Sequence, residues 1–247
     1  MVAGEQIQMS FNLENKKYKA VVLAAGRGVR IGETSEDLPK VLLPIKGKPL
    51  LWYVIDYWRK YVDEFVFVVG HQKEMVVDYL NNLDIKQSSV VQCEPKGIAD
   101  ALMRAKNQIN DNFILILGDC YCRGIFDFPD EFEQGVGIWQ TQNQEMIKKS
   151  YSVEIKDNCL SRVVEKPKEI VNDSCGMGFY FFSQRVFDHI GRTPPSSLRN
   201  EVEITDVIEK MIEAGEKIMP IYFQGDYINV NYPEDLINLL NKYEGED

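Results

Sequence analysis

The sequence predicts an α/β protein: a doubly wound, mostly parallel sheet, continued by a mixed or antiparallel part. Two observations predict this class. Up to about residue 125, short apolar runs alternate with segments whose apolar residues recur at helical spacing. Beyond that point, most apolar runs follow one another without an intervening helical segment. Parallel strands need helical crossovers between them, whereas antiparallel strands can follow one another directly.

The elements of the first half follow in order. Residues 18–25 form a short, mostly apolar run that ends at Gly26, which is typical of a buried parallel strand. Pro49 favours the first turn of a helix, and apolar residues recur after it at helical spacing as far as Val62. We expect the remaining strands at 65–69, 89–92 and 113–117, and helices at 73–83 and 98–109. This alternation predicts right-handed crossovers and a Rossmann-like sheet.

The second half, about 126–247, is predicted to join the first, about 18–125, in one domain. We expect strands at 135–141, 151–155, 160–165, 176–182 and 217–223, and helices at 204–214 and 234–243. Thr205 is a candidate N-cap for the first of these two helices. Residues 1–17 show no clear period and are expected to form an N-terminal arm.

The composition excludes several classes of function. The chain has 247 residues, with 28 Lys and Arg against 38 Asp and Glu, a formal charge of −10. An acidic chain is a poor candidate for binding nucleic acid or an anionic membrane surface. No apolar run approaches the roughly 20 residues that span a bilayer, and residues 1–19 lack the apolar core of a signal peptide. Five scattered cysteines give no disulfide framework, so we expect a cytoplasmic protein.

The loop after the first predicted strand has the character of a phosphate site. Glycines at Gly26 and Gly28 let backbone N–H groups approach an anion, and Arg27, Arg30 and Lys40 add positive charge. The loop lacks the Gly-Lys-Ser/Thr of a Walker A motif, and its glycine spacing does not match a dinucleotide fingerprint. Taken alone, a Gly-x-Gly is equally compatible with a plain tight turn.

The whole set of motifs is more specific, and it resembles the sugar-1-phosphate nucleotidyltransferase family. The motifs occur in the family's order over roughly residues 18–240: Leu23-Ala-Ala-Gly-x-Gly-x-Arg30, Pro39-Lys40-x-Leu-Leu-Pro44, Gln92-x-x-Pro95-x-Gly97, Leu117-Gly-Asp119, Glu165-Lys166-Pro167, Gly178-x-Tyr180 and Val230-Asn231-x-Pro233. The segment that begins at Gln92 is most similar to the thymidylyl- and uridylyltransferases that act on hexose 1-phosphates.

The resemblance implies a role for each matching residue. Catalytic residues would be Arg30 on the β- and γ-phosphates, Lys40 at the α-phosphate and Asp119 as a ligand of Mg²⁺. Nucleotide-binding positions would be Leu23, Ala24, Ala25, Gly26, Arg27, Gly28, Gln92 and Gly97, with the last two at the edge of a thymine or uracil. Positions for the sugar and its phosphate would be Tyr151, Ser152, Glu165, Lys166 and Gly178.

The implied reaction makes an NDP-sugar and pyrophosphate from dTTP or UTP and a sugar 1-phosphate, with glucose 1-phosphate as the default. A phosphate oxygen is already an anionic nucleophile at neutral pH, so the scarcity of histidine is no obstacle. The reaction needs in-line positioning and neutralisation of charge. A carboxylate such as Asp119 is the hard ligand that Mg²⁺ prefers.

The sequence departs from the family pattern near its C-terminal end. Many members place a second metal-binding Asp in a Trp-x-Asp-x-Gly-Thr-Pro motif, and Asn229 stands at that position here. The alternatives are Asn231, two residues on, and Asp226. Cys120 and Cys122 flank the expected metal site, but thiols are poor partners for Mg²⁺, so we expect them to serve in packing.

Two other functions remain open at this stage. A cytidylyltransferase could use CTP with a sugar, an alditol or a phosphonate as acceptor. A nucleotide-sugar-binding regulatory subunit would keep the fold without turnover, although a non-catalytic protein has less use for Arg30, Lys40 and Asp119 together. The expected partners are a nucleoside triphosphate and a sugar 1-phosphate, and the sequence is compatible with a homo-oligomer.

Overall fold

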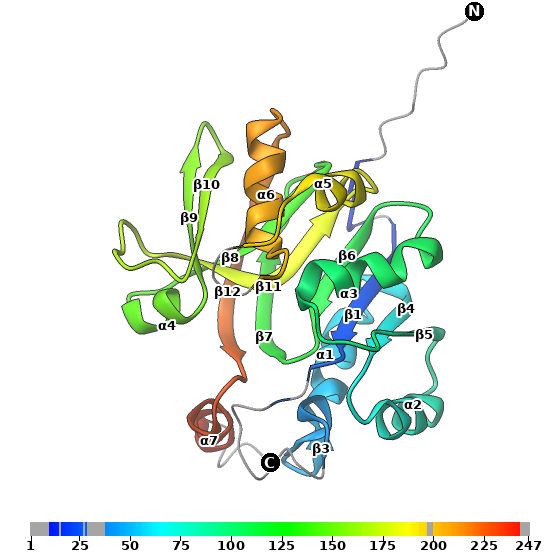
Figure 1. Ribbon diagram of the computed structural model, residues 1–247. Helices are drawn as coiled ribbons and strands as arrows, with labels where there is room; N and C mark the ends of the chain where they lie inside the picture. Colours follow the sequence, from blue (N-terminus) through cyan, green and yellow to red (C-terminus); the bar gives the residue numbers. More distant parts are fainter. Residues whose placement is uncertain (1–9, 15, 27, 29–37, 197–199, 243–247) are drawn as a thin grey trace, which may run out of the picture.

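A single curled sheet organises the molecule in the computed structural model, which describes residues 10–14, 16–26, 28, 38–196 and 200–242 (Figure 1). Its strand order is β5-β4-β1-β6-β11-β8-β12-β7, with β9 attached to β11 and β10 to β9. The strands are β1 Tyr18–Ala24, β4 Val62–Val69, β5 Gln87–Val91, β6 Phe113–Leu117, β7 Cys120–Asp127, β8 Gln134–Gln140, β9 Tyr151–Lys156, β10 Cys159–Glu165, β11 Ser174–Phe182 and β12 Ile218–Asn229.

The predicted fold class is confirmed. Strand β1 lies between β4 and β6 and pairs with both in parallel, and β4 pairs in parallel with β5. Strand β11 then joins β6 in the antiparallel direction and carries the second half of the chain into the same sheet. That half is mixed, because β8 pairs in parallel with β12 and antiparallel with β11.

Helices cover both faces of the sheet, and each face has its own apolar core. The helices are α1 Leu50–Trp58, α2 Lys73–Asn81, α3 Gly97–Ala105, α4 Gln144–Lys149, α5 Val186–Arg192, α6 Ile204–Glu213 and α7 Pro233–Lys242. Side chains of α1 and α2 pack on one face, with Val22 of β1 and Phe179 of β11. Side chains of α3, α5 and α6 pack on the other, with Val21 and Tyr180 of the same two strands. Alternate residues of one strand therefore enter opposite cores.

Several element boundaries differ from the sequence-based prediction. Helix α1 ends at Trp58, which is fully buried, and Val62 begins β4 instead of extending the helix. Thr205 was expected to cap α6, but it lies inside the helix and the N-cap is Glu203. The prediction also lacked β7, α4, α5 and the small hairpin of β2 (Pro44–Ile45) and β3 (Lys48–Pro49).

The described part of the N-terminal arm packs against the sheet. Phe11 is fully buried and forms an isolated bridge with Phe132, and the two rings stack at 5.0 Å. No helix in the described ranges is long and apolar enough to cross a membrane.

Candidate active site

The centre of the candidate site is the turn between β6 and β7, which carries Asp119. Gly118 N donates to Leu23 O at 3.0 Å, so this turn lies directly against the end of β1 and the start of the first loop. A Cβ at Gly118 would lie 2.6 Å from Leu23 O. The close approach of the two backbones therefore requires glycine, and it brings the end of β1, after which the glycine-rich loop begins, beside the turn that carries Asp119.

Lys40 reaches the same point from the 3₁₀ helix Lys40–Leu42. Its ammonium group pairs with Asp119 Oδ2 and donates to Asn231 Oδ1 at 3.3 Å. The Lys40 residue is only 9% exposed. A charge so deeply buried needs a partner of opposite sign, and Asp119 supplies it. The lysine and the aspartate singled out by the motifs are thus joined in one buried ion pair.

The end of β12 brings Asn229 to this pair. Strand β12 runs antiparallel to β7, with Asn229 opposite Cys120, and Val230 N donates to Asp119 O at 2.9 Å. Asn229 Oδ1 is buried and has no hydrogen-bond partner among the described residues. Asp226 lies three positions back on the strand, opposite Arg123. Of the three residues considered for a second metal ligand, the strand register therefore brings Asn229 and Asn231 to the site and leaves Asp226 away from it.

A cavity of about 160 Å³ opens beside the Lys40–Asp119 pair. Of the residues predicted for the sugar phosphate, Tyr151, Glu165, Lys166 and Gly178 line it, together with Asp119 and Asn229. Ser152 does not: it is 2% exposed and points away from the cavity within the β9–β10–β11 pairing. Lining residues that the prediction did not name are Ile98, Leu117, Lys149, Ser150, Tyr180, Glu203 and Ile204. Lys149 and Ser150 directly precede the predicted Tyr151 in the sequence, and this adjacency could have identified them as candidates.

Tyr151 forms a wall of the cavity through its ring. Its hydroxyl donates to Met177 O at 2.8 Å, inside the protein, and its ring stacks on Tyr180 at 6.4 Å. Burial raises the pKa of the Tyr151 hydroxyl well above its ordinary value, so the group stays neutral. This residue therefore shapes the cavity rather than offering it a charge.

Polar groups next to Tyr151 come from Glu165, its partner across the β9–β10 pairing, and from Lys166. Glu165 Oε2 accepts a hydrogen bond from Thr205 Oγ1 at 3.5 Å, which ties β10 to α6. Lys166 has a positive φ of 45°, and its N donates to Ser150 O at 2.8 Å. A left-handed backbone is unusual for lysine, and here it turns the chain directly at the cavity wall.

Gln92 and Gly97 lie on the other side of β1, at the end of β5. Gln92 N donates to Val69 O at 2.8 Å, and its side-chain Nε2 donates to Gly97 O at 3.2 Å and to Asp100 Oδ2 at 2.8 Å. Neither residue lines the cavity beside Asp119. The Leu23–Gly28 loop follows β1, which lies between β5 and β11 in the sheet order, so the two groups flank it.

Some predicted residues lie outside this description. Arg27 and Arg30 fall outside the described residues.

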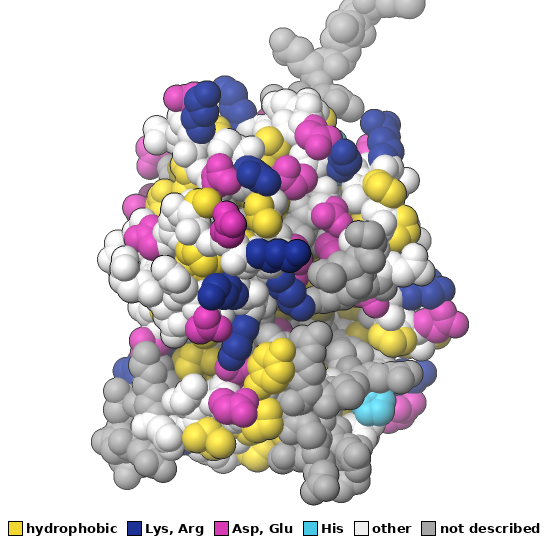
Figure 2. Space-filling view, turned by 60° about the vertical axis from the view of Figure 1, so that its left-hand side comes forward, with side chains coloured by type: hydrophobic (Ala, Val, Ile, Leu, Met, Phe, Trp, Pro, Cys, Tyr) yellow, Lys and Arg dark blue, Asp and Glu magenta, His cyan; other side chains and the backbone are white. Residues whose placement is uncertain are grey.

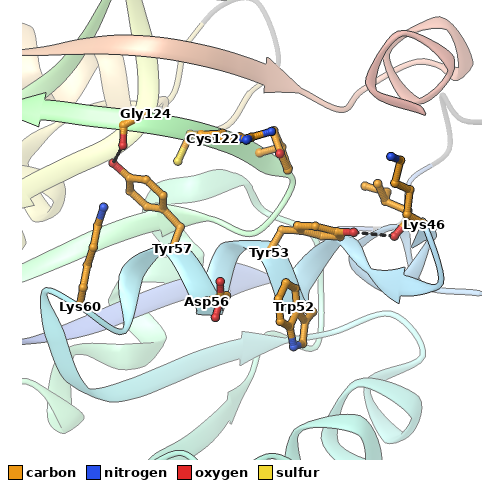
Figure 3. A pocket seen from close by; sticks show the side chains of 11 residues that line it. Lys46, Trp52, Tyr53, Asp56, Tyr57, Lys60, Cys122 and Gly124 are labelled. Atoms are coloured by element: carbon orange, nitrogen blue, oxygen red, sulfur yellow. Dashed lines mark hydrogen bonds between the residues drawn. The ribbon is translucent and has the colours of Figure 1, made fainter. Parts of the chain in front are cut away.

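A further cavity, of about 480 Å³, lies between α1 and β7 and is lined by Trp52, Tyr53, Tyr57 and their neighbours (Figure 3). Of the residues singled out from the sequence, Cys122, which was expected to serve in packing, lines it, and no predicted catalytic or substrate-binding residue does.

The fold and this arrangement define a class of protein. A glycine-rich loop after the first parallel strand, with a buried lysine and a carboxylate beside it, is the arrangement of an enzyme that transfers a phosphate-bearing group. A family model described as nucleotidyl transferase matches residues 19–245, and the chain belongs to this family.

Curated relatives support this assignment. The chain is 31% identical over 232 residues to the bifunctional protein GlmU of Methanococcus maripaludis, covering 90% of this chain and 54% of GlmU. The chain thus spans about half the length of the GlmU relatives that it matches. It is 29% identical over 236 residues to the UTP–glucose-1-phosphate uridylyltransferase AglF of Haloferax volcanii, covering 88% of this chain and 93% of AglF.

Solved structures share the fold. A UDP-glucose pyrophosphorylase complexed with UDP-glucose superposes with a TM-score of 0.82 at 23% identity, covering 94% of this chain and all of the other. A glucose-1-phosphate thymidylyltransferase from Bacillus anthracis gives 0.80 at 21% identity, covering 92% of this chain and 95% of the other.

Proposed function

We propose that this protein makes an NDP-sugar and pyrophosphate from UTP or dTTP and a sugar 1-phosphate, with UTP and glucose 1-phosphate as the first pair to test. The observation that carries the proposal is the Lys40–Asp119 pair: it lies at the turn that contacts the end of β1, and Asp119 lines the same cavity as Glu165 and Lys166. The similarity to AglF over nearly the full length of both chains supports the choice of substrates.

The chemistry requires charge neutralisation but no general base. An oxygen of the sugar phosphate attacks the α-phosphorus of the nucleotide, a new P–O bond forms, and the bond to pyrophosphate breaks. Lys40 would stabilise the negative charge that gathers around the α-phosphate. Lys149 and Lys166 at the cavity wall would hold the phosphate of the acceptor, and Glu165 would accept hydrogen bonds from the hydroxyls of its sugar.

The residues at the site fit Mg²⁺. Asp119 offers a carboxylate, and Asn229 offers a buried Oδ1 without a hydrogen-bond partner among the described residues. In those residues no three His, Cys, Asp or Glu side chains cluster closely enough to hold a metal, which suits an ion that binds through one carboxylate, substrate phosphates and water. Once bound, Mg²⁺ would supply positive charge at the phosphates.

The hydrogen bonds of Gln92 favour uracil or thymine over cytosine. Both contacts of its side chain use Nε2, so Oε1 is the atom left to meet a base. An acceptor there matches the N3–H of uracil or thymine, whereas cytosine has no hydrogen at N3 and would have to meet it with its N4 amino group. The five cysteines are unpaired, which supports a reducing compartment such as the cytoplasm.

The direct test measures pyrophosphate release from each nucleoside triphosphate with Mg²⁺ and glucose 1-phosphate, then with a panel of other phosphate acceptors. We expect release with UTP or dTTP and none from the Asp119→Ala variant. Release with CTP alone would identify a cytidylyltransferase instead. Nucleotide binding without release on any acceptor would contradict the proposal and identify a binding protein.

A further inference from the structure

Three buried groups lie directly behind Asp119 and form a hydrogen-bonded chain. Gly178 N donates to Tyr227 Oη at 3.0 Å, and Tyr227 Oη lies 3.3 Å from Cys120 Sγ. Cys120 Sγ in turn lies 3.8 Å from Asp119 Oδ1. These groups come from β11, β12 and β7, so the chain joins three strands that meet at the candidate site.

The carboxylate of Asp119, at which these contacts end, fixes the direction of the hydrogen bonds. An ionised carboxylate can only accept a hydrogen bond, so the Cys120 thiol donates to Asp119. The hydrogen between Tyr227 and Cys120 must then come from the tyrosine hydroxyl, and the hydroxyl oxygen accepts from Gly178 N. Every link therefore donates toward Asp119.

The thiol of Cys120 packs closely against Gly178. A Cβ at Gly178 would lie 2.5 Å from Cys120 Sγ and 3.0 Å from Leu117 Cβ. The thiol thus fills the space left by the missing side chain of Gly178. Cys120 is fully buried and Tyr227 is 3% exposed, so water does not compete for these bonds.

Tyr227 also bears on the second oxygen at the site. Tyr227 and Asn229 are two residues apart on β12, in a stretch that pairs with β7 without a register shift, so their side chains leave the same face of the strand. Anchoring Tyr227 therefore anchors the strand end that presents Asn229. With Lys40 on Oδ2 and the thiol on Oδ1, both oxygens of Asp119 are held.

We propose that Tyr227 is a positioning residue: its hydroxyl, acting through Cys120 and through β12, holds Asp119 and Asn229 in the geometry that binds the metal and the substrate phosphates. The inference rests on the proposed function, because it assigns the chain to the metal site of that reaction. It gives Cys120 a role beyond packing.

The test compares Tyr227→Phe with the wild-type protein. The substitution removes the hydroxyl alone and keeps the ring contacts with Phe179 at 5.8 Å and Trp139 at 5.9 Å. We expect Mn²⁺, titrated alone by electron paramagnetic resonance, to bind about 10-fold more weakly, the range seen when a partner of a metal ligand is lost. The Mg²⁺ concentration for half-maximal turnover should rise in parallel, with a smaller change in the KM for glucose 1-phosphate.

Matched variants separate positioning from general stability. Tyr57→Phe likewise removes a single phenolic hydroxyl, which donates to Gly124 O at 3.2 Å (Figure 3). Gly124 lies four residues along β7 from Cys120, so this variant should leave Mn²⁺ binding unchanged. Cys120→Ala should reproduce the part of the effect of Tyr227→Phe that passes through the thiol, and Cys120→Ser, which keeps a donor, should restore part of the affinity. The double variant Tyr227→Phe/Cys120→Ala should bind no more weakly than Tyr227→Phe alone, because both substitutions break one chain.

Several results would overturn the inference. One is an unchanged Mn²⁺ affinity in folded Tyr227→Phe; should that variant not fold, an unchanged affinity in Cys120→Ala decides in the same way. Another is wild-type Mn²⁺ binding that survives Asp119→Ala. A wild-type protein that binds Mn²⁺ through Asp119 but releases no pyrophosphate would refute the proposed function, while the comparison of variants would still decide the role of Tyr227.

Discussion

Asn229 brings a neutral oxygen to a site whose Asp119 already shares its charge with Lys40. Asn229→Asp would add one negative charge beside the metal position. We expect Mn²⁺ to bind roughly 10-fold more tightly, because the number of charged ligands tunes the affinity of such sites. The measurement is a Mn²⁺ titration of both proteins.

The control for this change is Asn238→Asp, which adds the same charge at an exposed position of α7. It should leave the affinity unchanged. Equal or weaker binding by Asn229→Asp would mean that Asn229 does not contact the metal.

Lys40 is expected to contribute strongly to turnover. Lys40→Ala leaves Asp119 and Asn231 in place but removes the cation next to the reacting phosphate. We expect kcat to fall about 100- to 1,000-fold, as when a preorganised charge-stabilising donor is lost. Single-turnover kinetics on saturating substrates measures this. The exposed Lys148→Ala, whose lysine pairs with Glu145, serves as control, and a kcat close to that of wild type in Lys40→Ala would remove Lys40 from the mechanism.

For single residues, the motifs predicted which residues meet at the site better than they predicted which way each side chain points. The resemblance selected Lys40 and Asp119, and the structure joins them. It also selected Ser152, which faces the protein interior, because alternate residues of a strand point to opposite sides and the motif does not fix the pleat of β9. The contacts of Cys120 depend on three strands that are distant in sequence, so no local pattern could show them.

Among the elements, the parallel strands were the most predictable. Strands such as β1 and β6 are buried on both faces and are therefore almost entirely apolar, a pattern that the sequence displays directly. Along edge strand β7, buried and exposed residues do not alternate regularly: Cys120 to Cys122 are all buried, and Arg123 is exposed. The sequence of this strand therefore shows no simple period. The helix α1 ran on to Val62 in the prediction because the spacing of buried residues continues across the boundary with β4.

The contact between β9 and β11 gives a prediction for an element. A Cβ at Gly176 would overlap the ring of Tyr151, and backbone surrounds both residues. Gly176→Ala should therefore destabilise the protein by about 1–3 kcal/mol through overpacking. Thermal unfolding should show this as a fall of about 2–4 °C per kcal/mol.

The matched control is Gly191→Ala, in α5, where a Cβ meets nothing within 4 Å. That variant should be as stable as wild type or slightly more so. Because Tyr151 walls the acceptor cavity, Gly176→Ala should also raise the KM for the sugar phosphate. An unchanged melting temperature and KM would show that the ring has room to move.

For the whole molecule, net charge and local charge lead to different conclusions. The charge of −10 disfavours binding to a polyanion but says nothing against a single triphosphate. Lys40, Lys149 and Lys166 converge on one small region, and Figure 2 shows basic side chains gathered across the middle of one face with acidic ones scattered around them. Folding therefore concentrates positive charge where the composition alone predicts an acidic surface.

Buried thiols and phenols make the stability of the whole fold sensitive to alkaline pH. Burial raises the pKa of Cys175 from 9.0 to about 11, against a smaller opposing effect of a hydrogen bond with Ser150. Burial also raises the pKa of Tyr151, Tyr180 and Tyr227. Above pH 9 the unfolded chain loses these protons first, so the native state holds more protons and the free energy of unfolding falls as the pH rises.

We therefore expect the urea midpoint to be constant near neutral pH and to decline steadily between about pH 9 and pH 11, the interval set by Cys175. Cys175→Ala removes one of the responsible groups, so its decline should be shallower than that of wild type, whatever its stability at neutral pH. Cys93→Ala, which removes an exposed thiol, should follow the wild-type curve. A midpoint that rises or stays level over this interval would show that the buried groups do not hold their protons as the packing requires.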